Sequence, residues 1–257
     1  MPTPEQITAR FDARAAAYRK GRPGYPAEAA RWVVAECGWR AGDYIAELGA
    51  GTGQFTGLLL SEGLRVLAIE PNDDMRAALE HTMGGRNGFN AHSGHAEDTR
   101  LPPASMAGVV AAQAFHWFDP AAAAAECRRI AAPESPAAVL WNMRRTAGDA
   151  FHRAYEQFLQ DWGTDYEAAS AAWNDRDRLQ VFYGGGHFST TSFEHAQTLD
   201  EAGLFARIAS CSYMPGVDDR QYEAMRDAAK ELFADHADDG QVRLIYDCVC
   251  HAGPMEG

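Results

Sequence analysis

The sequence predicts an α/β fold in which a mostly parallel sheet carries helices on both faces. Short apolar runs alternate with segments of helical period between Tyr44 and Trp141, and the first run ends in closely spaced glycines. Between Asn142 and Phe182 the pattern loosens into helices alone. Strands that alternate with helices form parallel sheets, because each helix crosses from one strand to the next. The loosened stretch predicts a helical cap over that sheet.

The individual elements follow from the spacing of apolar residues. Strands are expected where apolar residues run together or alternate, and helices where they recur three or four positions apart. The predicted strands are Tyr44–Leu48, Arg65–Ile69, Phe89–His92, Gly108–Ala112, Ala137–Trp141, Phe188–Phe193 and Val242–Cys250. The predicted helices are Pro4–Tyr18, Pro26–Cys37, Gln54–Ser61, Asp73–Met83, Pro120–Ile130, Ala150–Trp162, Tyr166–Trp173, Arg176–Phe182 and Gln221–His236. The last two strands are expected to pair and close one edge of the sheet.

Four regions are expected along the chain, with no internal repeat or flexible linker. Residues 1–40 would form two helices and a linker that covers a ligand, because Gly21 to Pro26 is too rich in Pro and Gly for a helix or strand. Residues 41–145 would form the binding core, 146–186 the helical cap, and 187–257 the remainder of the core.

Composition and charge exclude several classes of function. The chain has 23 Lys and Arg against 36 Asp and Glu, a formal charge of −13, so a nucleic-acid surface is not expected. The best apolar run, Ala107 to Phe118, is interrupted by Gln113 and His116, so no membrane span is expected. The amino terminus shows no secretory or lipidation signal, which predicts a cytoplasmic protein. Five scattered cysteines predict reduced thiols, and no metal-binding spacing is present.

A glycine-rich turn follows the first predicted strand, in the run Ala46-Glu47-Leu48-Gly49-Ala50-Gly51-Thr52-Gly53. Glycines let the backbone turn sharply against a ligand, and the next helix begins with its amides pointing into the same space. The dinucleotide fingerprint would need glycine where Gln54 stands, so pyrophosphate binding is disfavoured. The turn predicts a ligand site, and a plain tight strand-to-helix turn is the alternative.

Glu70 ends the second predicted strand, 23 residues after Glu47. A carboxylate at this place can accept hydrogen bonds from both hydroxyls of a ribose. An ordinary solvated glutamate before Pro71 is the alternative. Combined with the glycine turn, Glu70 predicts a nucleoside ligand.

Several further motifs complete a family pattern over nearly the whole chain. They are Tyr18-x-x-x-Arg22-Pro23-Gly24-Tyr25-Pro26, Glu70-Pro71-Asn72-Asp73-Asp74-Met75, Gly94-His95-Ala96-Glu97, Gln113-Ala114-Phe115-His116-Trp117-Phe118-Asp119, Leu140-Trp141-Asn142 and Ser210-Cys211-Ser212-Tyr213-Met214-Pro215. With the glycine turn, they resemble the class I S-adenosylmethionine-dependent methyltransferases, especially the type-11 branch that includes trans-aconitate methyltransferase-like proteins. The resemblance implies a Rossmann-like, seven-stranded sheet. It also implies S-adenosylmethionine as cofactor, S-adenosylhomocysteine as product, and a small-molecule acceptor.

The resemblance also implies roles for individual residues. The methionine part of the cofactor would be surrounded by Glu47, Gly49, Ala50, Gly51 and Gln113, and Tyr18 and Arg22 would close over its carboxylate. The nucleoside part would be held by Glu70 at the ribose and by Pro71, Met75, Ala96 and Glu97 around the adenine.

His116 follows the fourth predicted strand and is the candidate catalytic residue, as a base or a substrate-orienting group; a packed histidine is the alternative. The substrate chamber would be walled by Tyr25, Trp117, Trp141, Asn142 and Tyr213. Arg144 and Arg145 could attract an anionic substrate, although a solvated surface pair is favoured.

Methyl transfer to a small molecule is the expected function. Two alternatives stay open: a regulatory protein that binds the cofactor without transfer, and a cyclase that uses the cofactor's charge.

Overall fold

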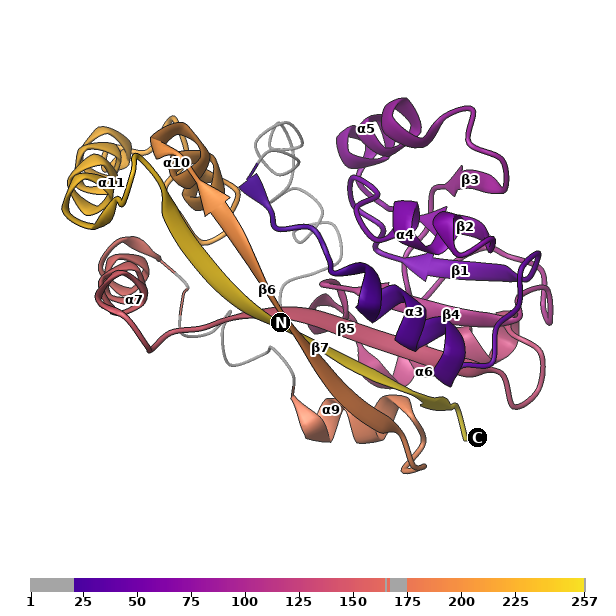
Figure 1. Cartoon of the computed structure of the whole chain (residues 1–257). Coiled ribbons are helices and arrows are strands. Elements are labelled where there is room, and N and C mark those ends of the chain that lie inside the picture. Colours follow the sequence, from indigo (N-terminus) through magenta and orange to yellow (C-terminus); the bar gives the residue numbers. More distant parts are fainter. Residues whose placement is uncertain (1–20, 165, 167–174, 257) are drawn as a thin grey trace.

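A single seven-stranded sheet organises the computed structural model, which describes residues 21–164, 166 and 175–256 (Figure 1). The predicted helix Pro4–Tyr18 and most of Tyr166–Trp173 lie outside these residues. The strands are β1 (Tyr44–Leu48), β2 (Arg65–Ile69), β3 (Phe89–His92), β4 (Gly108–Ala112), β5 (Pro136–Arg144), β6 (Ser189–Leu199) and β7 (Val242–Pro254). The helices are α3 (Ala27–Glu36), α4 (Thr56–Ser61), α5 (Asp73–Met83), the 3-10 turn η1 (Phe115–Trp117), α6 (Pro120–Ile130), α7 (Ala150–Trp162), α9 (Arg176–Phe182), α10 (Glu201–Ala209) and α11 (Tyr222–His236).

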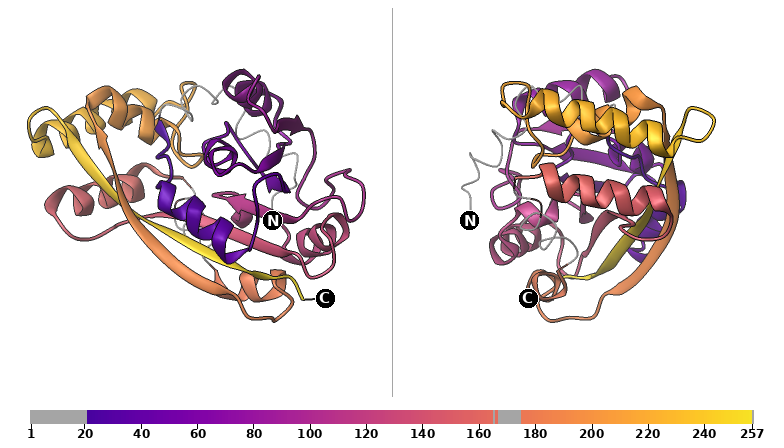
Figure 2. Two further views of the ribbon diagram at one scale, coloured as in Figure 1. Left: turned by 45° about the vertical axis from the view of Figure 1, so that its right-hand side comes forward. Right: turned by 90° about the vertical axis from the view of Figure 1, so that its left-hand side faces the viewer.

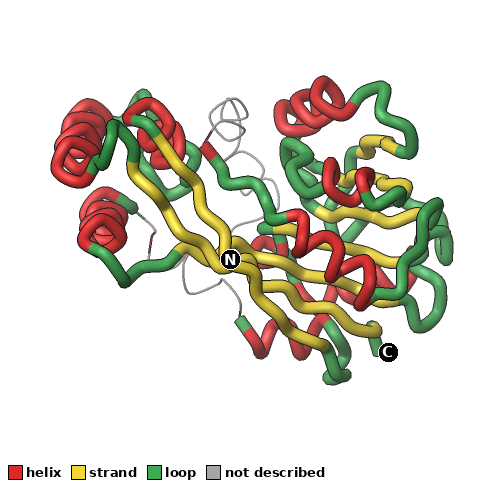
Figure 3. The backbone as a smooth tube through the Cα atoms, in the orientation of Figure 1, coloured by secondary structure: helices red, strands yellow, loops and turns green. Residues whose placement is uncertain are grey.

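The strand order is β3-β2-β1-β4-β5-β7-β6 (Figure 3). The first five strands run parallel, while β7 is antiparallel to both β5 and β6. The predicted fold class is therefore confirmed, including the strand pair at the edge. Because β1, β2, β4 and β5 run in the same direction, their carboxyl ends meet at one edge of the sheet, where α/β proteins bind ligands.

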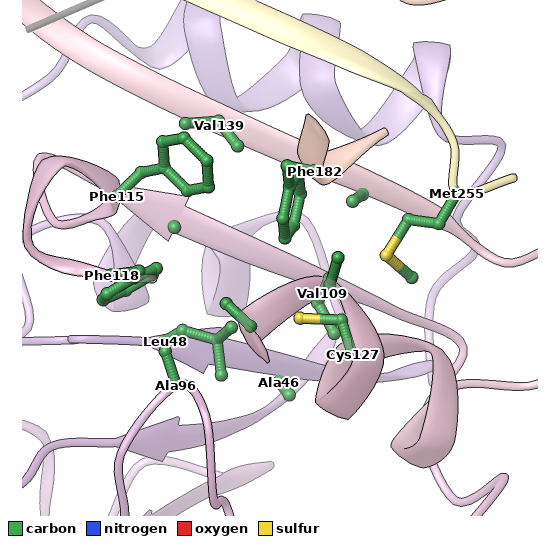
Figure 4. Close-up of a cluster of buried hydrophobic side chains, with 14 of the residues drawn as sticks. Ala46, Leu48, Ala96, Val109, Phe115, Phe118, Cys127, Val139, Phe182 and Met255 are labelled. Carbon is green, nitrogen blue, oxygen red and sulfur yellow. The ribbon is translucent and has the colours of Figure 1, made fainter. Parts of the chain in front are cut away.

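Two hydrophobic cores cover the two faces of the parallel strands. Side chains alternate along a strand, so Ala46 and Leu48 belong to one core while Ile45, next to Ala46 in the strand, belongs to the other. Figure 4 shows the first core, where Phe115 and Phe182 meet beside β4 and β5. The ring centroids of these two phenylalanines lie 5.0 Å apart in an edge-to-face arrangement.

A third core lies at the far ends of β6 and β7, which extend beyond the parallel strands (Figure 2). There α7, α10 and α11 gather around Leu199 of β6 and around Val242, Leu244 and Tyr246 of β7. We call this unit the outer lobe. The sequence did not predict α10, although Asp200 caps its amino terminus by accepting a hydrogen bond from the Gly203 amide.

The helical cap differs from the expected region 146–186 in its membership. α9 lies on the parallel core, where Leu179 and Phe182 are buried with Phe115. α10 and α11, which the sequence places in the remainder of the core, belong to the outer lobe. The long β6–β7 pair carries them there, because β6 and β7 run on past the last residue of β5. No helix in the described residues is long and apolar enough to cross a membrane.

Candidate active site

The glycine turn after β1 adopts a backbone that few side chains allow. Gly49 has a φ of +67° and Gly51 a φ of +58°, both in the left-handed region that favours glycine. The turn is held against β2, because the amides of Gly49 and Ala50 donate to the Ile69 carbonyl at 2.8 and 3.1 Å. The backbone is thereby bent around an open space at the end of β1.

Replacing Gly49 by alanine is expected to disturb this turn. A Cβ at Gly49 would lie 2.6 Å from the Cβ of Ala114, in addition to the cost of the positive φ. Overpacking of this kind costs about 1–3 kcal/mol. Gly85 provides a matched control, because its φ is +82° and a Cβ added there would meet nothing within 4 Å. We expect Gly49→Ala to lower the unfolding free energy and the affinity for S-adenosylhomocysteine more than Gly85→Ala does. Equal losses in the two variants would show that the close approach to Ala114 is unimportant.

Glu70 ties the turn to the next loop. Its Oε2 accepts from the Gly51 amide at 2.8 Å, and its Oε1 accepts from the Asn72 amide at 2.9 Å. The side chain is buried, and this burial raises the pKa of Glu70. Each carboxylate oxygen has a second lone pair, so Glu70 can still accept hydrogen bonds from a ligand.

Glu47 is the second buried carboxyl group at this edge. Its Oε2 accepts from the Thr56 hydroxyl at 2.5 Å. Burial raises the pKa of Glu47 to about 8. The hydrogen bond from Thr56 opposes this rise, and the negative charge of Glu70 adds to it. A cation at this place would favour the ionised form of Glu47 and would lower its pKa again.

Gln113 directly follows β4, in a backbone conformation that is rare for a residue with a side chain of this size. Its φ is +57°, and its Oε1 accepts from the Asn142 amide at 2.7 Å. The side chain therefore bridges the ends of β4 and β5. Sparsely populated backbone conformations concentrate at functional sites.

The segment from Gly21 to Pro26 crosses this edge of the sheet, and we call it the covering segment. The binding core holds it through Gln54, which donates to the Arg22 carbonyl at 3.3 Å, and through Asn142, which donates to the Gly24 carbonyl at 3.0 Å. The outer lobe and β6 hold it from the other side. There Gln197 donates to the Gly21 carbonyl at 3.0 Å, and Arg22 donates to the Ser210 carbonyl at 3.2 Å.

Two neighbouring pockets lie beneath the covering segment. The first, which we call the cradle, is lined by Tyr25, Glu47, Gly49, Ala50, Gly51, Thr52, Gln54, Phe55 and Ala112. The second, the adjoining pocket, is lined by Arg22, Pro23, Tyr25, Gln54, Gln113, Asn142, Arg144, Arg207, Tyr213 and Tyr246. Tyr25 and Gln54 belong to both linings, so the pockets meet at these side chains.

The cradle and the adjoining pocket bring together most of the predicted methionine-side residues, and Tyr18 lies outside the described residues. Sequence reasoning missed Thr52, Gln54 and Arg207. Thr52 and Gln54 stand within or next to the glycine motif, which is the signal that could have found them. Arg207 lies on the unpredicted helix α10.

The predicted adenine-side residues lie around the ends of β2 and β3 and outside both linings. Met75 is buried in the first turn of α5, and its amide donates to Asn72, which caps that helix. Ala96 is buried in the core. Glu97 accepts from the Asp119 amide at 2.8 Å, so one of its oxygens is already engaged. Pro71 is partly buried between Glu70 and this helix.

His116 lies on η1, directly after β4. Its Nδ1 accepts from the Trp141 indole at 3.4 Å, and its ring lies 4.8 Å from the ring of Trp117. Burial, together with the nearby charges of Arg22 and Arg178, lowers the pKa of His116 to about 3. The imidazole is neutral at physiological pH, and in the tautomer that accepts at Nδ1 the proton lies on Nε2.

The predicted substrate walls divide between two places. Tyr25, Asn142 and Tyr213 line the adjoining pocket. Trp141 is fully buried in the core with Phe115, outside the pocket lining, and donates a hydrogen bond to His116. Asn142 is also held by His195, whose Nε2 lies 2.8 Å from its Oδ1.

The favoured sequence interpretation, a solvated surface pair, is wrong for Arg144, because its side chain is only 5% exposed. Arg144 and Arg145 both form ion pairs, but they are not equivalent. Arg144 is buried and forms an ion pair with Glu156. Arg145 is partly exposed and pairs with Asp247 at 2.9 Å and with Glu194 at 2.7 Å. The neighbouring carboxylates neutralise the charge of each arginine.

The segment that forms most of the cradle resembles known proteins. Residues 46–139, which contain the glycine turn, Glu70 and Gln113, match the family model described as a methyltransferase domain. This segment is a methyltransferase domain. It contains β1 to β4 and the first part of β5, so the outer lobe lies outside the match.

Curated relatives of the methyltransferase domain are described as methyltransferases. An uncharacterized methyltransferase of Mycobacterium tuberculosis is 38% identical over 138 residues, which are 52% of this chain and 52% of the relative. Another, from Schizosaccharomyces pombe, is 31% identical over 142 residues, 54% of each chain. The chain thus matches about half the length of these relatives.

Solved structures share the fold of the methyltransferase domain together with the outer lobe. A candidate type II methyltransferase from Anaeromyxobacter dehalogenans has a TM-score of 0.65 at 21% identity, over 91% of this chain and 98% of that chain. The cyclase SpnF has a TM-score of 0.56 at 15% identity, over 96% of this chain and 97% of its own. At these identities the likeness shows the Rossmann-like methyltransferase fold and no particular reaction.

Proposed function

We propose that this chain transfers a methyl group from S-adenosylmethionine to a small-molecule acceptor. The observation that carries the proposal is the cradle, where the buried carboxyl group of Glu47 lies beside a left-handed glycine turn and the buried Glu70 holds that turn through the Gly51 amide. Glu47 would face the positively charged methionine part, and Glu70 would accept from the ribose hydroxyls. The adenine would lie toward Pro71, Met75, Ala96 and Glu97.

The free hydrogen-bonding groups of the cradle fit such a ligand. The Thr52 hydroxyl is buried and makes no hydrogen bond within the described residues, although it lines the cradle. A buried polar atom without a partner is costly unless a ligand satisfies it. S-Adenosylmethionine offers an ammonium, a carboxylate and ribose hydroxyls, which match the carboxyl groups, the amides and the hydroxyl of this site.

The bound cofactor supplies an electrophilic methyl group on a sulfonium. The acceptor's lone pair forms the new bond to that carbon while the bond to sulfur breaks and sulfur keeps its electron pair. The contribution of the chain is to hold both reactants in line beneath the covering segment and to exclude water. Residues of the covering segment and of the outer lobe line the adjoining pocket, so we propose a small molecule and not a folded macromolecule as the acceptor.

Binding and turnover together test the proposal. Calorimetry should show that S-adenosylhomocysteine binds and that NAD does not, since Gln54 stands where the pyrophosphate turn needs glycine. Incubation with methyl-labelled S-adenosylmethionine and candidate acceptors should then yield S-adenosylhomocysteine and labelled product. Binding without any transfer would favour a regulatory protein, and product formation that leaves the label on the cofactor would favour a cyclase.

His116 is proposed to orient the acceptor as a hydrogen-bond donor and not to act as a base. A pKa of about 3 is far below the range that suits a general base near neutral pH. We expect His116→Leu to lower turnover by about 10²-fold through misplacement of the acceptor, and His116→Gln to retain more activity because an amide can still donate. Turnover should show no inflection from His116 between pH 5 and 8. Equal losses in the two variants, together with an inflection near pH 6 to 7 that they abolish, would instead identify a base.

A further inference from the structure

The adjoining pocket contains a buried arginine that no carboxylate of the described residues neutralises. Arg207, on α10, is only 5% exposed. Its Nε donates to the Tyr246 hydroxyl at 3.0 Å, and its Nη1 lies 2.8 Å from the Cys211 sulfur and 3.5 Å from the Ser210 hydroxyl. Its Nη2 makes no hydrogen bond with any described residue. A buried guanidinium normally pairs with an acid, because removing a charge from water is costly.

The rest of the pocket does not supply the missing charge. Its described lining holds three arginines, Arg22, Arg144 and Arg207, and no aspartate or glutamate. Glu156 pairs with Arg144 from behind the lining. Arg207 therefore brings a positive charge to the pocket, in a chain whose formal net charge is −13.

The remaining walls add aromatic side chains and an amide donor. Tyr25, Tyr213 and Tyr246 supply aromatic faces. The Gln113 carbonyl is engaged by the Asn142 amide, so the amide nitrogen of Gln113 is the group left to donate. A carboxylate accepts hydrogen bonds and donates none, which matches a pocket lined by a guanidinium and an amide donor.

We propose that Arg207 binds an anionic group, most simply a carboxylate, of the acceptor substrate. This inference rests on the proposed function, because the adjoining pocket meets the cradle at Tyr25 and Gln54. An acceptor held by Arg207 would lie under the covering segment beside the cradle. Arg207 would thereby select among acceptors by charge.

Two other roles for Arg207 lead to different results. The carboxylate of the cofactor's own methionine could be the anion, in which case loss of Arg207 would weaken cofactor binding. The Cys211 thiol could be the counter-ion, since Arg207 and Arg22 hold its pKa below the usual range although burial opposes them. In that case Arg207 would be a structural residue, and its loss would destabilise the protein.

The test uses paired probes that differ in charge, with the wild-type chain saturated with S-adenosylhomocysteine. Calorimetry would compare benzoate with benzamide and succinate with succinamide. We expect each acid to bind at least about 10-fold more tightly than its amide, as charge-assisted hydrogen bonds predict. Arg207→Met should abolish this preference and change the affinity for S-adenosylhomocysteine less than about 2-fold. Arg145→Met, at a paired arginine outside the pocket lining, should leave both affinities unchanged.

Stability gives an independent readout. Arg207→Met removes a buried charge at similar volume, so without ligand it should melt at or above the temperature of the wild type. Arg207→Lys keeps the charge but loses the forked geometry, and it should retain part of the acid preference.

Several results would overturn the inference. The first is that acids and amides bind the wild type equally, or that neither binds. The second is that Arg207→Met loses acid binding and S-adenosylhomocysteine binding in parallel. The third is a clear fall in the melting temperature of that variant. Failure of S-adenosylhomocysteine to bind the wild type would instead overturn the proposed function.

Discussion

Glu70→Ala is expected to weaken S-adenosylhomocysteine binding by about 10²-fold, because a charge-assisted hydrogen bond contributes about 1.5–3 kcal/mol and the substitution removes more than one. In addition to the proposed ribose contacts, the variant loses the two acceptors that hold the Gly51 and Asn72 amides. Both backbone groups would be left without a partner at the edge of the cradle. Calorimetry measures the affinity, and thermal unfolding should show a second loss, in stability.

The position of Glu70 also makes its conservative variant informative. Glutamine offers a single carbonyl oxygen, so Glu70→Gln can satisfy one of the two amides and would place its own NH₂ group against the other. We therefore expect Glu70→Gln to resemble Glu70→Ala in binding. Glu80→Ala is the matched control, because Glu80 is an exposed glutamate on α5. A folded Glu70→Ala protein with unchanged affinity would place the ribose elsewhere.

Glu47→Gln is expected to change stability and binding in opposite directions. In the unfolded chain Glu47 ionises near pH 4.5, whereas in the folded protein it keeps its proton up to about pH 8. The unfolded state thus binds fewer protons between these values, so Glu47 lowers the free energy of unfolding as pH rises from 4.5 to 8. Glutamine cannot ionise, so in Glu47→Gln this residue no longer lowers the free energy of unfolding as the pH rises. At pH 7.5 the variant should melt several degrees above the wild type.

The same substitution removes the negative charge that we propose faces the cofactor. The affinity of the wild type for S-adenosylmethionine should rise between pH 6 and 8, because the cationic ligand selects the ionised form of Glu47 and releases a proton. Glu47→Gln should bind about 10-fold or more weakly at pH 8, and its affinity should depend less on pH. Calorimetry in buffers of different ionisation enthalpy would detect the released proton. Unchanged affinity in Glu47→Gln would mean that Glu47 serves the turn and not the ligand.

The sequence by itself determined the sheet and the cradle. Apolar runs such as Tyr44–Leu48 and Arg65–Ile69 have the bounds that β1 and β2 have in the structure, because strands buried on both faces appear as continuous apolar segments. The glycine turn was equally predictable. Its left-handed residues need glycine for local steric reasons, and the acids at positions 47 and 70 end neighbouring parallel strands, which places them at one edge.

Only the tertiary structure decided what lies opposite the cradle. The helix α9 belongs to the parallel core, whereas α10 belongs to the outer lobe. The two helices are separated because the long strand β6 lies between them in sequence and extends beyond the parallel strands. Ion pairing decided which arginine is left without a carboxylate partner among the described residues. Arg144 and Arg145 follow Asn142 closely and are candidates in the sequence for binding an anionic substrate, yet both form ion pairs with carboxylates. Arg207 belongs to no sequence motif, and it becomes a binding candidate because folding buries it in the pocket with no acid of the described residues beside it. Whether a charge is compensated depends on contacts between residues distant in the chain, and local sequence does not encode those contacts.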